Sequence, residues 1–266
     1  MKQKNILVTF LFFSLLEIFS FWRPIGKLFW IYLIGSCLIL IGIILWSIGL
    51  QFKKWFSLEI ITHSIYLLLP ILFYLANLFF LLLIQTIFFR QIFLLVNTVL
   101  CLMILMGIRG IILNLEQNIK PRLTYNFLVL STIWTGFLLY SVIWAFYRDL
   151  NLSIWLIISF FFLINILLYY QILHLFGALK RRALIYSLVI ALILSEIVWV
   201  LCFWPLEYFY SGLLLTIVSY IFWGVSHHQL ENTLTRKLIL EYLIIGVIIF
   251  ILIFRRSIIA LGFRGY

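Results

Sequence analysis

The sequence predicts an all-α polytopic integral membrane protein, a helical bundle with about nine transmembrane helices. Composition is the first observation: 66% of the 266 residues are hydrophobic and 10% are charged. A soluble domain is about 25% charged, so these few polar groups could not cover a water-facing surface. The second observation is that the apolar runs are long and lack the alternation of membrane β-strands.

Nine apolar runs are candidate spans, because a helix needs about 20 residues to cross a hydrocarbon core of about 30 Å. In order, they are Ile6–Trp22, Leu28–Leu50, Ile60–Phe89, Ile92–Leu113, Asn126–Tyr147, Ile154–Gly177, Ala183–Trp204, Glu207–Val225 and Leu238–Phe254. The third is too long for one untilted span and too short for two, which predicts tilt, a kink or an interfacial extension. Eight or ten spans are the alternative counts.

The polar stretches between these runs are short, so residues 1–266 are expected to form a single transmembrane domain without a separate soluble domain. The first run has a basic start, as a signal peptide does. However, Glu17 interrupts it and no small-x-small cleavage site follows, so we expect an uncleaved first span. Pro205 is expected at a helix start, with Glu207 in its first turn, where a carboxylate favours the helix dipole.

The distribution of basic residues predicts orientation. Twelve of the nineteen Lys and Arg residues fall on the side that carries the N-terminus, which predicts a cytoplasmic N-terminus. Arg255, Arg256 and Arg264 in the C-terminal tail oppose this bias, which keeps an even number of spans open. We expect a multi-pass protein of the cell membrane, the cytoplasmic membrane in a prokaryote.

The basic residues lie in small clusters at the ends of apolar runs and form no continuous basic face with a recognition motif. This argues against binding to nucleic acid. The expected partner is therefore the lipid bilayer, with protein partners or a homo-oligomer left open.

A stripe of glycines marks the second run. Gly35, Gly42 and Gly49 are seven residues apart, which is almost two helical turns, so they share one face. Small residues let helix backbones approach closely in lipid. The stripe predicts tight packing within the bundle, or a pivot or dimer contact.

The third run repeats this spacing with polar chemistry. His63, Pro70 and Asn77 share one face, and proline leaves the carbonyl of Tyr66 without its helical partner. Such a face in lipid has to look towards protein or a water-filled cavity. It predicts either the lining of a substrate path or a kinked helix whose polar groups bond to neighbours.

Two carboxylates lie within spans. Glu17 and Glu196 both fall past the middle of their runs, towards the proposed external side. Ionisable groups inside a span are functional candidates because their insertion costs about 2.5–3.5 kcal/mol. The pair could share a proton, bind a cation or meet a basic residue such as Arg23 or Arg90; a neutral acid or a structural ion pair is the alternative. With His63 and Asn77 they form the candidate intramembrane polar site.

A second candidate cluster lies near the proposed cytoplasmic interface, where Arg109, His174 and Glu241 fall close to span ends. Snorkelling or local pairing, such as Glu241 with Lys237, is the alternative explanation. The chain contains no HExxH, GxSxG, CxxC or phosphate-loop motif. Catalytic residues, metal ligands and cofactors are therefore not predicted.

Together these observations favour a non-enzymatic membrane component, either a structural subunit or an assembly factor. Two alternatives stay open. One is a carrier or flippase-like protein that moves a small or lipid-linked substrate through a polar intramembrane cavity. The other is an intramembrane enzyme that acts on lipid.

Overall fold

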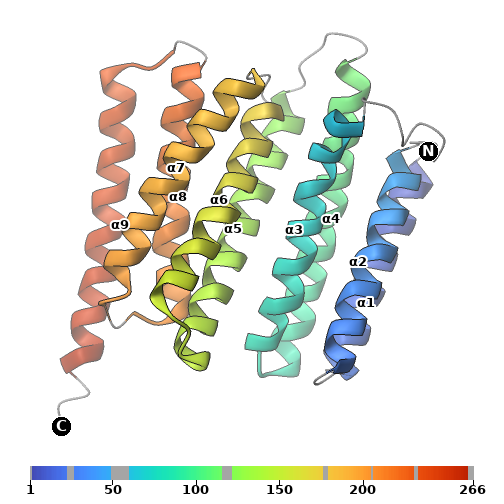
Figure 1. Ribbon diagram of the computed structural model, residues 1–266, viewed down its shortest axis with the longest axis horizontal. Coiled ribbons are helices and arrows are strands. Elements are labelled where there is room, and N and C mark those ends of the chain that lie inside the picture. Colours follow the sequence, from blue (N-terminus) through green and yellow to red (C-terminus); the bar gives the residue numbers. More distant parts are fainter. Residues whose placement is uncertain are drawn as a thin grey trace. The chain divides into compact units, whose positions relative to one another are not determined.

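The computed structural model describes the backbone of residues 2–22, 27–48, 60–115, 122–175, 179–204, 206–230 and 233–262. It describes the side chains of residues 5–22, 28–42, 67–108, 110, 125–174, 179–204, 206–230, 233–248 and 251. All regular structure in this part of the chain is α-helical (Figure 1). The helices are α1 (Lys2–Trp22), α2 (Lys27–Ile48), α3 (Ile60–Leu83), α4 (Ile87–Leu115), α5 (Arg122–Leu150), α6 (Ile154–Leu175), α7 (Lys180–Leu201), α8 (Tyr208–Leu230) and α9 (Arg236–Gly262).

One predicted element is wrong. The run Ile60–Phe89 is not a single tilted helix, because α3 ends at Leu83 and α4 begins at Ile87. The amide of Arg90 donates to the carbonyl of Thr86 at 3.1 Å, which makes Thr86 the N-cap of α4, a position where threonine is favoured. The Arg90 side chain also donates to the carbonyl of Ile84 at 3.1 Å. These bonds satisfy backbone carbonyls in the break between α3 and α4. The break was not predicted because the residues around it are mostly apolar.

Six helices are long and apolar enough to cross a membrane in the described part of the chain. They contain the segments Asn5–Trp22, Ile87–Ile108, Tyr125–Leu150, Ile154–His174, Lys180–Leu201 and Tyr208–Leu230. Shorter apolar helical segments occur at Leu28–Gly42 and Leu67–Leu83. Many large apolar side chains are exposed on these helices, as lipid-facing surfaces require. The structure thus supports a helical membrane bundle, while nine crossings stay a prediction.

Chain contacts divide the protein into two compact units, Met1–Thr135 (unit 1) and Gly136–Tyr266 (unit 2), and the division falls within α5. In unit 1, α1 packs most extensively against α4 and also contacts α2 and α3. The ring of Phe12 on α1 stacks on Phe73 of α3 and meets Tyr74 edge-on. Aromatic rings therefore form much of the contact between α1 and α3.

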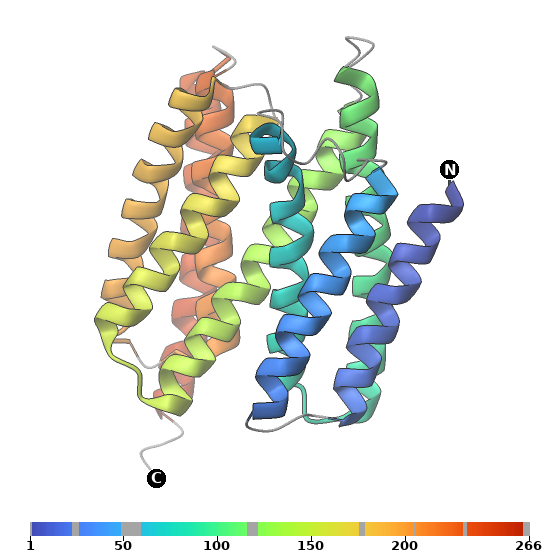
Figure 2. The same ribbon diagram turned by 45° about the vertical axis from the view of Figure 1, so that its right-hand side comes forward.

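In unit 2, the most extensive pairing joins α6 and α7, which lie side by side in both ribbon views (Figures 1 and 2). The buried face of α7 explains this closeness, because small residues recur on it every four positions. They are Ala183, Ser187, Ala191 and Ser195. Small side chains at this spacing let two helices approach closely in lipid. The opposite face of α7 is consequently turned away from α6.

The core of unit 2 is built from α5, α6, α7 and α8. Tyr140 stacks on Phe161 with ring centroids 5.4 Å apart, and Phe137 meets Phe209 edge-on. The other buried members include Ile143, Trp144, Ile157, Val198, Leu201, Leu206, Leu214 and Leu215. This core packs the C-terminal parts of α5 and α7 against the N-terminal part of α8. The cavity described below lies beside it.

Candidate functional site

Glu17 lies in a polar cluster at one end of unit 1. Its Oε1 accepts a hydrogen bond from the Gln91 side-chain amide at 2.8 Å. Its Oε2 is buried and has no hydrogen-bond partner among the described residues. Next to it, the guanidinium of Arg90 donates to the carbonyl of Ser20 at 3.0 Å. The sequence suggested Arg90 as a counter-charge for Glu17. In the structure the Arg90 guanidinium donates to Ser20, which lies about one helical turn after Glu17.

Asn77 is completely buried in α3. Its Nδ2 donates to the carbonyl of Phe73 at 2.7 Å, and its Oδ1 has no hydrogen-bond partner in the described part of the chain. Pro70 lies within α3, seven residues or almost two helical turns earlier. The side chain of His63 lies outside the described residues, so the predicted face is described only from Leu67 onwards.

Two further buried amides were missed by the sequence analysis. Asn97 and Asn165 each donate to the phenylalanine carbonyl four residues earlier, as Asn77 does. Their oxygens then accept bonds from other helices: Asn97 Oδ1 from the indole of Trp134 at 2.8 Å, and Asn165 Oδ1 from the Tyr140 hydroxyl. The recurrent spacing Phe-x-x-x-Asn was visible in the sequence and indicates the same side-chain geometry at all three positions.

Glu196 is exposed on α7. It has no hydrogen bond or ion pair with any described residue of the chain. Its neighbours on the same face are apolar and about half exposed, namely Leu192 (52%), Trp199 (49%) and Val200 (58%). Glu196 belongs to unit 2 and Glu17 to unit 1, and the contacts within each unit do not bring the two carboxylates together.

The predicted cytoplasmic cluster is not assembled by the described contacts. The ring of His174 is half-buried and lies near Tyr170 on its own helix, with centroids 6.1 Å apart. Glu241 is exposed on α9, and the side chain of Arg109 lies outside the described residues. Groups of three or more His, Cys, Asp or Glu side chains that could hold a metal ion do not occur among the residues that the structure describes.

The glycine stripe does not mark a close helix contact at its first two positions. A Cβ at Gly35 or Gly42 would meet no atom within 4 Å, and Gly49 lies outside the described residues. Close approaches occur elsewhere, because a Cβ on Gly212 would clash with Ser141 of α5 and one on Gly107 with Leu128. The seven-residue spacing was therefore a poor guide to packing in this chain.

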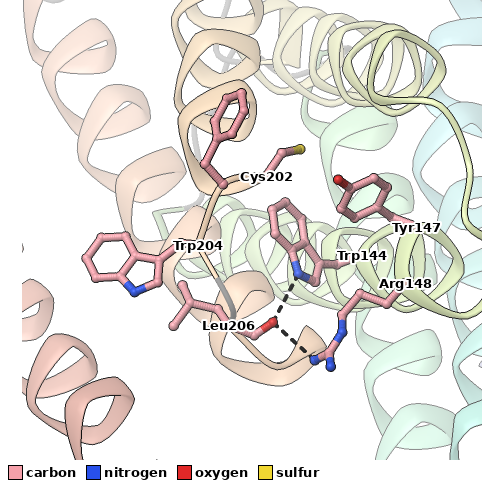
Figure 3. A pocket seen from close by; sticks show the side chains of 7 residues that line it. Trp144, Tyr147, Arg148, Cys202, Trp204 and Leu206 are labelled. Atoms are coloured by element: carbon pink, nitrogen blue, oxygen red, sulfur yellow. Dashed lines mark hydrogen bonds between the residues drawn. The ribbon is translucent and has the colours of Figure 1, made fainter. Parts of the chain in front are cut away.

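A cavity of about 290 Å³ lies at the end of unit 2, where α5 ends and the chain turns from α7 to α8. Figure 3 shows Trp144, Tyr147 and Arg148 of α5 facing Cys202 and the backbone carbonyl of Leu206 in that connection, while the ring of Trp204 points away from them. Both the Trp144 indole and the Arg148 guanidinium donate to the carbonyl of Leu206, at 3.4 and 3.3 Å. These two bonds tie the connection to α5 beside the cavity.

The α7–α8 connection has local reasons for its shape. After α7 ends, the amides of Phe203 and Trp204 donate to the carbonyls of Val200 and Leu201, at 3.2 and 2.9 Å, and close the last turn. The predicted span Ala183–Trp204 is thus shifted by one turn, because Cys202–Trp204 is a turn. The carbonyl of Glu207 accepts from the Ser211 amide at 3.0 Å, so Glu207 is the N-cap of α8. Pro205 lies outside the described residues.

These features define the class: a multi-pass helical membrane protein with buried polar contacts inside each unit and a cavity in unit 2 where α5 ends. The chain belongs to the family described as "Protein of unknown function (DUF5656)", whose model matches residues 24–255. The matched region contains Glu196 and the cavity, whereas Glu17 precedes it. Neither a curated protein nor a solved structure matches the chain.

Proposed function

We propose that this protein is a non-enzymatic membrane subunit whose α7 packs against a transmembrane helix of a different protein. The observation that carries the proposal is the exposure of Glu196 on an otherwise apolar face of α7. A subunit or assembly factor needs a surface of this kind, in which apolar packing supplies area and one polar group supplies specificity.

The depth of Glu196 makes the exposure expensive in lipid. It lies five residues before Leu201, the end of α7, which is about 7 Å along the helix. A charged side chain at the centre of a span costs about 2.5–3.5 kcal/mol on insertion scales, and Glu196 bears part of this cost because it lies about 7 Å inside the helix end. A hydrogen-bond donor or a cation from a neighbouring helix offsets this cost, and lipid tails offer neither.

Charge complementarity selects the partner. A two-fold contact between copies through this face would set Glu196 against Glu196 of the second copy, and like charges at one depth repel. A helix that carries Arg, Lys, His or an amide at the matching depth meets the carboxylate favourably. The proposed occupant is therefore a helix of another membrane protein with such a side chain.

The interior of unit 2 also supports a structural role. The Tyr140 hydroxyl bonds to Asn165 and lies 3.3 Å from the Ser219 hydroxyl, while the Tyr169 hydroxyl donates to the carbonyl of Ser219. These bonds tie α5, α6 and α8 together within the apolar interior. Buried polar groups that bond to one another stabilise a fixed arrangement of helices.

A carrier or flippase-like function is the second candidate, and a different observation favours it. Glu17 Oε2 and Asn77 Oδ1 are both buried in unit 1 without a hydrogen-bond partner among the described residues. Unsatisfied acceptors in a low-dielectric interior suit a proton or a small polar substrate. If Glu17→Gln abolishes a proton-linked or cation-linked flux at unchanged abundance, this candidate replaces the first.

Photo-crosslinking in native membranes tests the proposed subunit role. A photoreactive amino acid at Leu192 or Trp199 is expected to give a discrete adduct with another protein. The same residue at Val99 of α4, which is equally exposed at 56%, is the matched control and is expected to label mainly lipid. The adduct supports the proposal only if its linked peptide is a transmembrane segment with a basic or amide side chain. Labelling of lipid alone from all three positions contradicts it.

A further inference from the structure

The cavity of unit 2 carries an inference that does not depend on the contact at α7. We infer that this cavity binds the phosphate group of an anionic phospholipid headgroup through Arg148. The argument rests on the depth of the cavity, on its charge and on the chemistry of its walls.

The cavity lies at the level of lipid headgroups. The apolar segment Tyr125–Leu150 ends beside it, Lys180–Leu201 ends beside it, and Tyr208–Leu230 begins beside it. Three span ends at one level mark the boundary of the hydrocarbon core, and the headgroup region extends beyond that boundary. A ligand that reaches this cavity from the bilayer therefore presents its headgroup.

Arg148 supplies the positive charge. Its side chain is exposed, and one bond to the Leu206 carbonyl engages NH1 at 3.3 Å. A guanidinium has five N–H donors arranged in a planar fork, and that fork matches two phosphate oxygens. Among the described residues, those that line the cavity include no carboxylate, so the ligand that balances the charge of Arg148 is an anion.

The aromatic side chains that line the cavity indicate which part of the lipid lies next to the phosphate. Trp144 is 1% exposed and is fixed by its bond to Leu206, and Tyr147 adds a second aromatic ring. Aromatic side chains with an apolar body and a polar edge suit the glycerol region, where apolar and polar groups meet. A volume of about 290 Å³ is at the lower end for ligand pockets, so a headgroup enters and the acyl chains stay outside.

Cys202 gives a direct measure of occupancy, because its thiol lines the cavity. In a Cys37→Ala, Cys101→Ala background, it is the only cysteine left of three. Detergent-purified full-length protein would be treated with iodoacetamide while dihexanoyl phosphatidylglycerol, dihexanoyl phosphatidylcholine or sodium phosphate is titrated. Protection of the thiol then reports binding at the cavity.

We expect the phosphatidylglycerol to slow the alkylation of Cys202 and the phosphatidylcholine to do so far less. Arg148→Gln should raise the concentration for half-protection by about tenfold or more, and Arg148→Lys by less, because it keeps the charge but loses the fork. Arg181→Gln is the matched control: Arg181 is an exposed cation at the other end of α7, so its loss should leave protection unchanged.

Three results overturn the inference: undiminished protection in Arg148→Gln, equal protection by phosphatidylcholine, or no protection by any phosphate compound. Protection by sodium phosphate as strong as that by the lipid identifies free phosphate, and not a headgroup, as the ligand. Native mass spectrometry gives a second readout that needs no cysteine chemistry. The wild type should retain phosphatidylglycerol in preference to Arg148→Gln, and equal retention contradicts the inference.

Discussion

Gly212 on α8 lies directly against Ser141 on α5. A Cβ built on Gly212 would lie 3.0 Å from the backbone nitrogen of Ser141 and closer still to its Oγ. Because the backbone of α5 cannot shift like the end of a flexible side chain, this contact sets the distance between the two helices.

Gly212→Ala is therefore expected to destabilise unit 2 by about 1–3 kcal/mol, the range for overpacking a close contact. The matched control is Gly42→Ala on α2, where a Cβ meets nothing within 4 Å. That variant should be as stable as the wild type or slightly more stable, since alanine favours helix. Detergent unfolding followed by tryptophan fluorescence measures both, and equal stability of the two variants would contradict the packing described for Gly212.

The hydroxyl of Tyr140 is the shared member of the buried polar contacts in unit 2. Tyr140→Phe removes its bonds to Asn165 and Ser219 and leaves the Asn165 oxygen without that donor. A loss of about 0.6 kcal/mol is expected, and at most about 1.7 kcal/mol, which are the average and the maximum measured for bonds between membrane helices. Tyr170→Phe is the control, because Tyr170 is half-buried on the same helix as Asn165. An unfolding midpoint that Tyr140→Phe leaves unchanged would show that these bonds add no stability.

The pH dependence of the alkylation rate of Cys202 should be shifted to higher pH than that of a free thiol. Burial raises the pKa of the Cys202 thiol above its ordinary value, and a hydrogen bond with Tyr147 partly opposes this rise. The thiolate is the reactive species. At pH 8 a smaller fraction of the Cys202 thiol is ionised than of a free thiol, whose pKa is about 8.5, so Cys202 reacts more slowly. The rate with iodoacetamide should keep rising where the rate of glutathione has levelled off. A plateau at the same pH as glutathione would contradict the raised pKa.

The polar contact between α4 and α5 gives a further prediction. Trp134→Phe removes the indole N–H and leaves the Oδ1 of buried Asn97 without it. A buried acceptor that loses its donor destabilises by about 1–3 kcal/mol. In a double-mutant cycle, Asn97→Leu should abolish most of the effect of Trp134→Phe. Additive losses would show that the two side chains are not coupled.

The positions of most helices followed from the sequence, because long apolar runs have few other solutions in lipid. The break after Leu83 did not, since Gln85 and Thr86 are only two polar residues within a long apolar stretch. Gly35 and Gly42 were predicted as a packing stripe, whereas the small residues on the buried face of α7 were not predicted. In lipid, both faces of a helix are apolar, so periodicity alone does not show which face meets protein.

The same reason limits the candidate site. The sequence singled out Glu196 as an ionisable residue within a predicted span, but its exposure follows from which face of α7 packs on α6. The cavity was hidden for a different reason: Trp144, Arg148 and Cys202 come from separate segments, and only the turn after α7 brings them together. Aromatic residues at span ends had a sufficient explanation as an interfacial belt.

Charge reversal combined with photo-crosslinking tests the central claim, that α7 presents Glu196 to another membrane protein. The photoreactive residue stays at Leu192, and the adduct is compared between the wild type, Glu196→Lys and Glu207→Lys. Glu207 is an exposed carboxylate outside the span, so it controls for the change in charge. We expect Glu196→Lys to lose the adduct and Glu207→Lys to keep it. An adduct that survives Glu196→Lys, or that consists of two copies of this chain, would contradict the account.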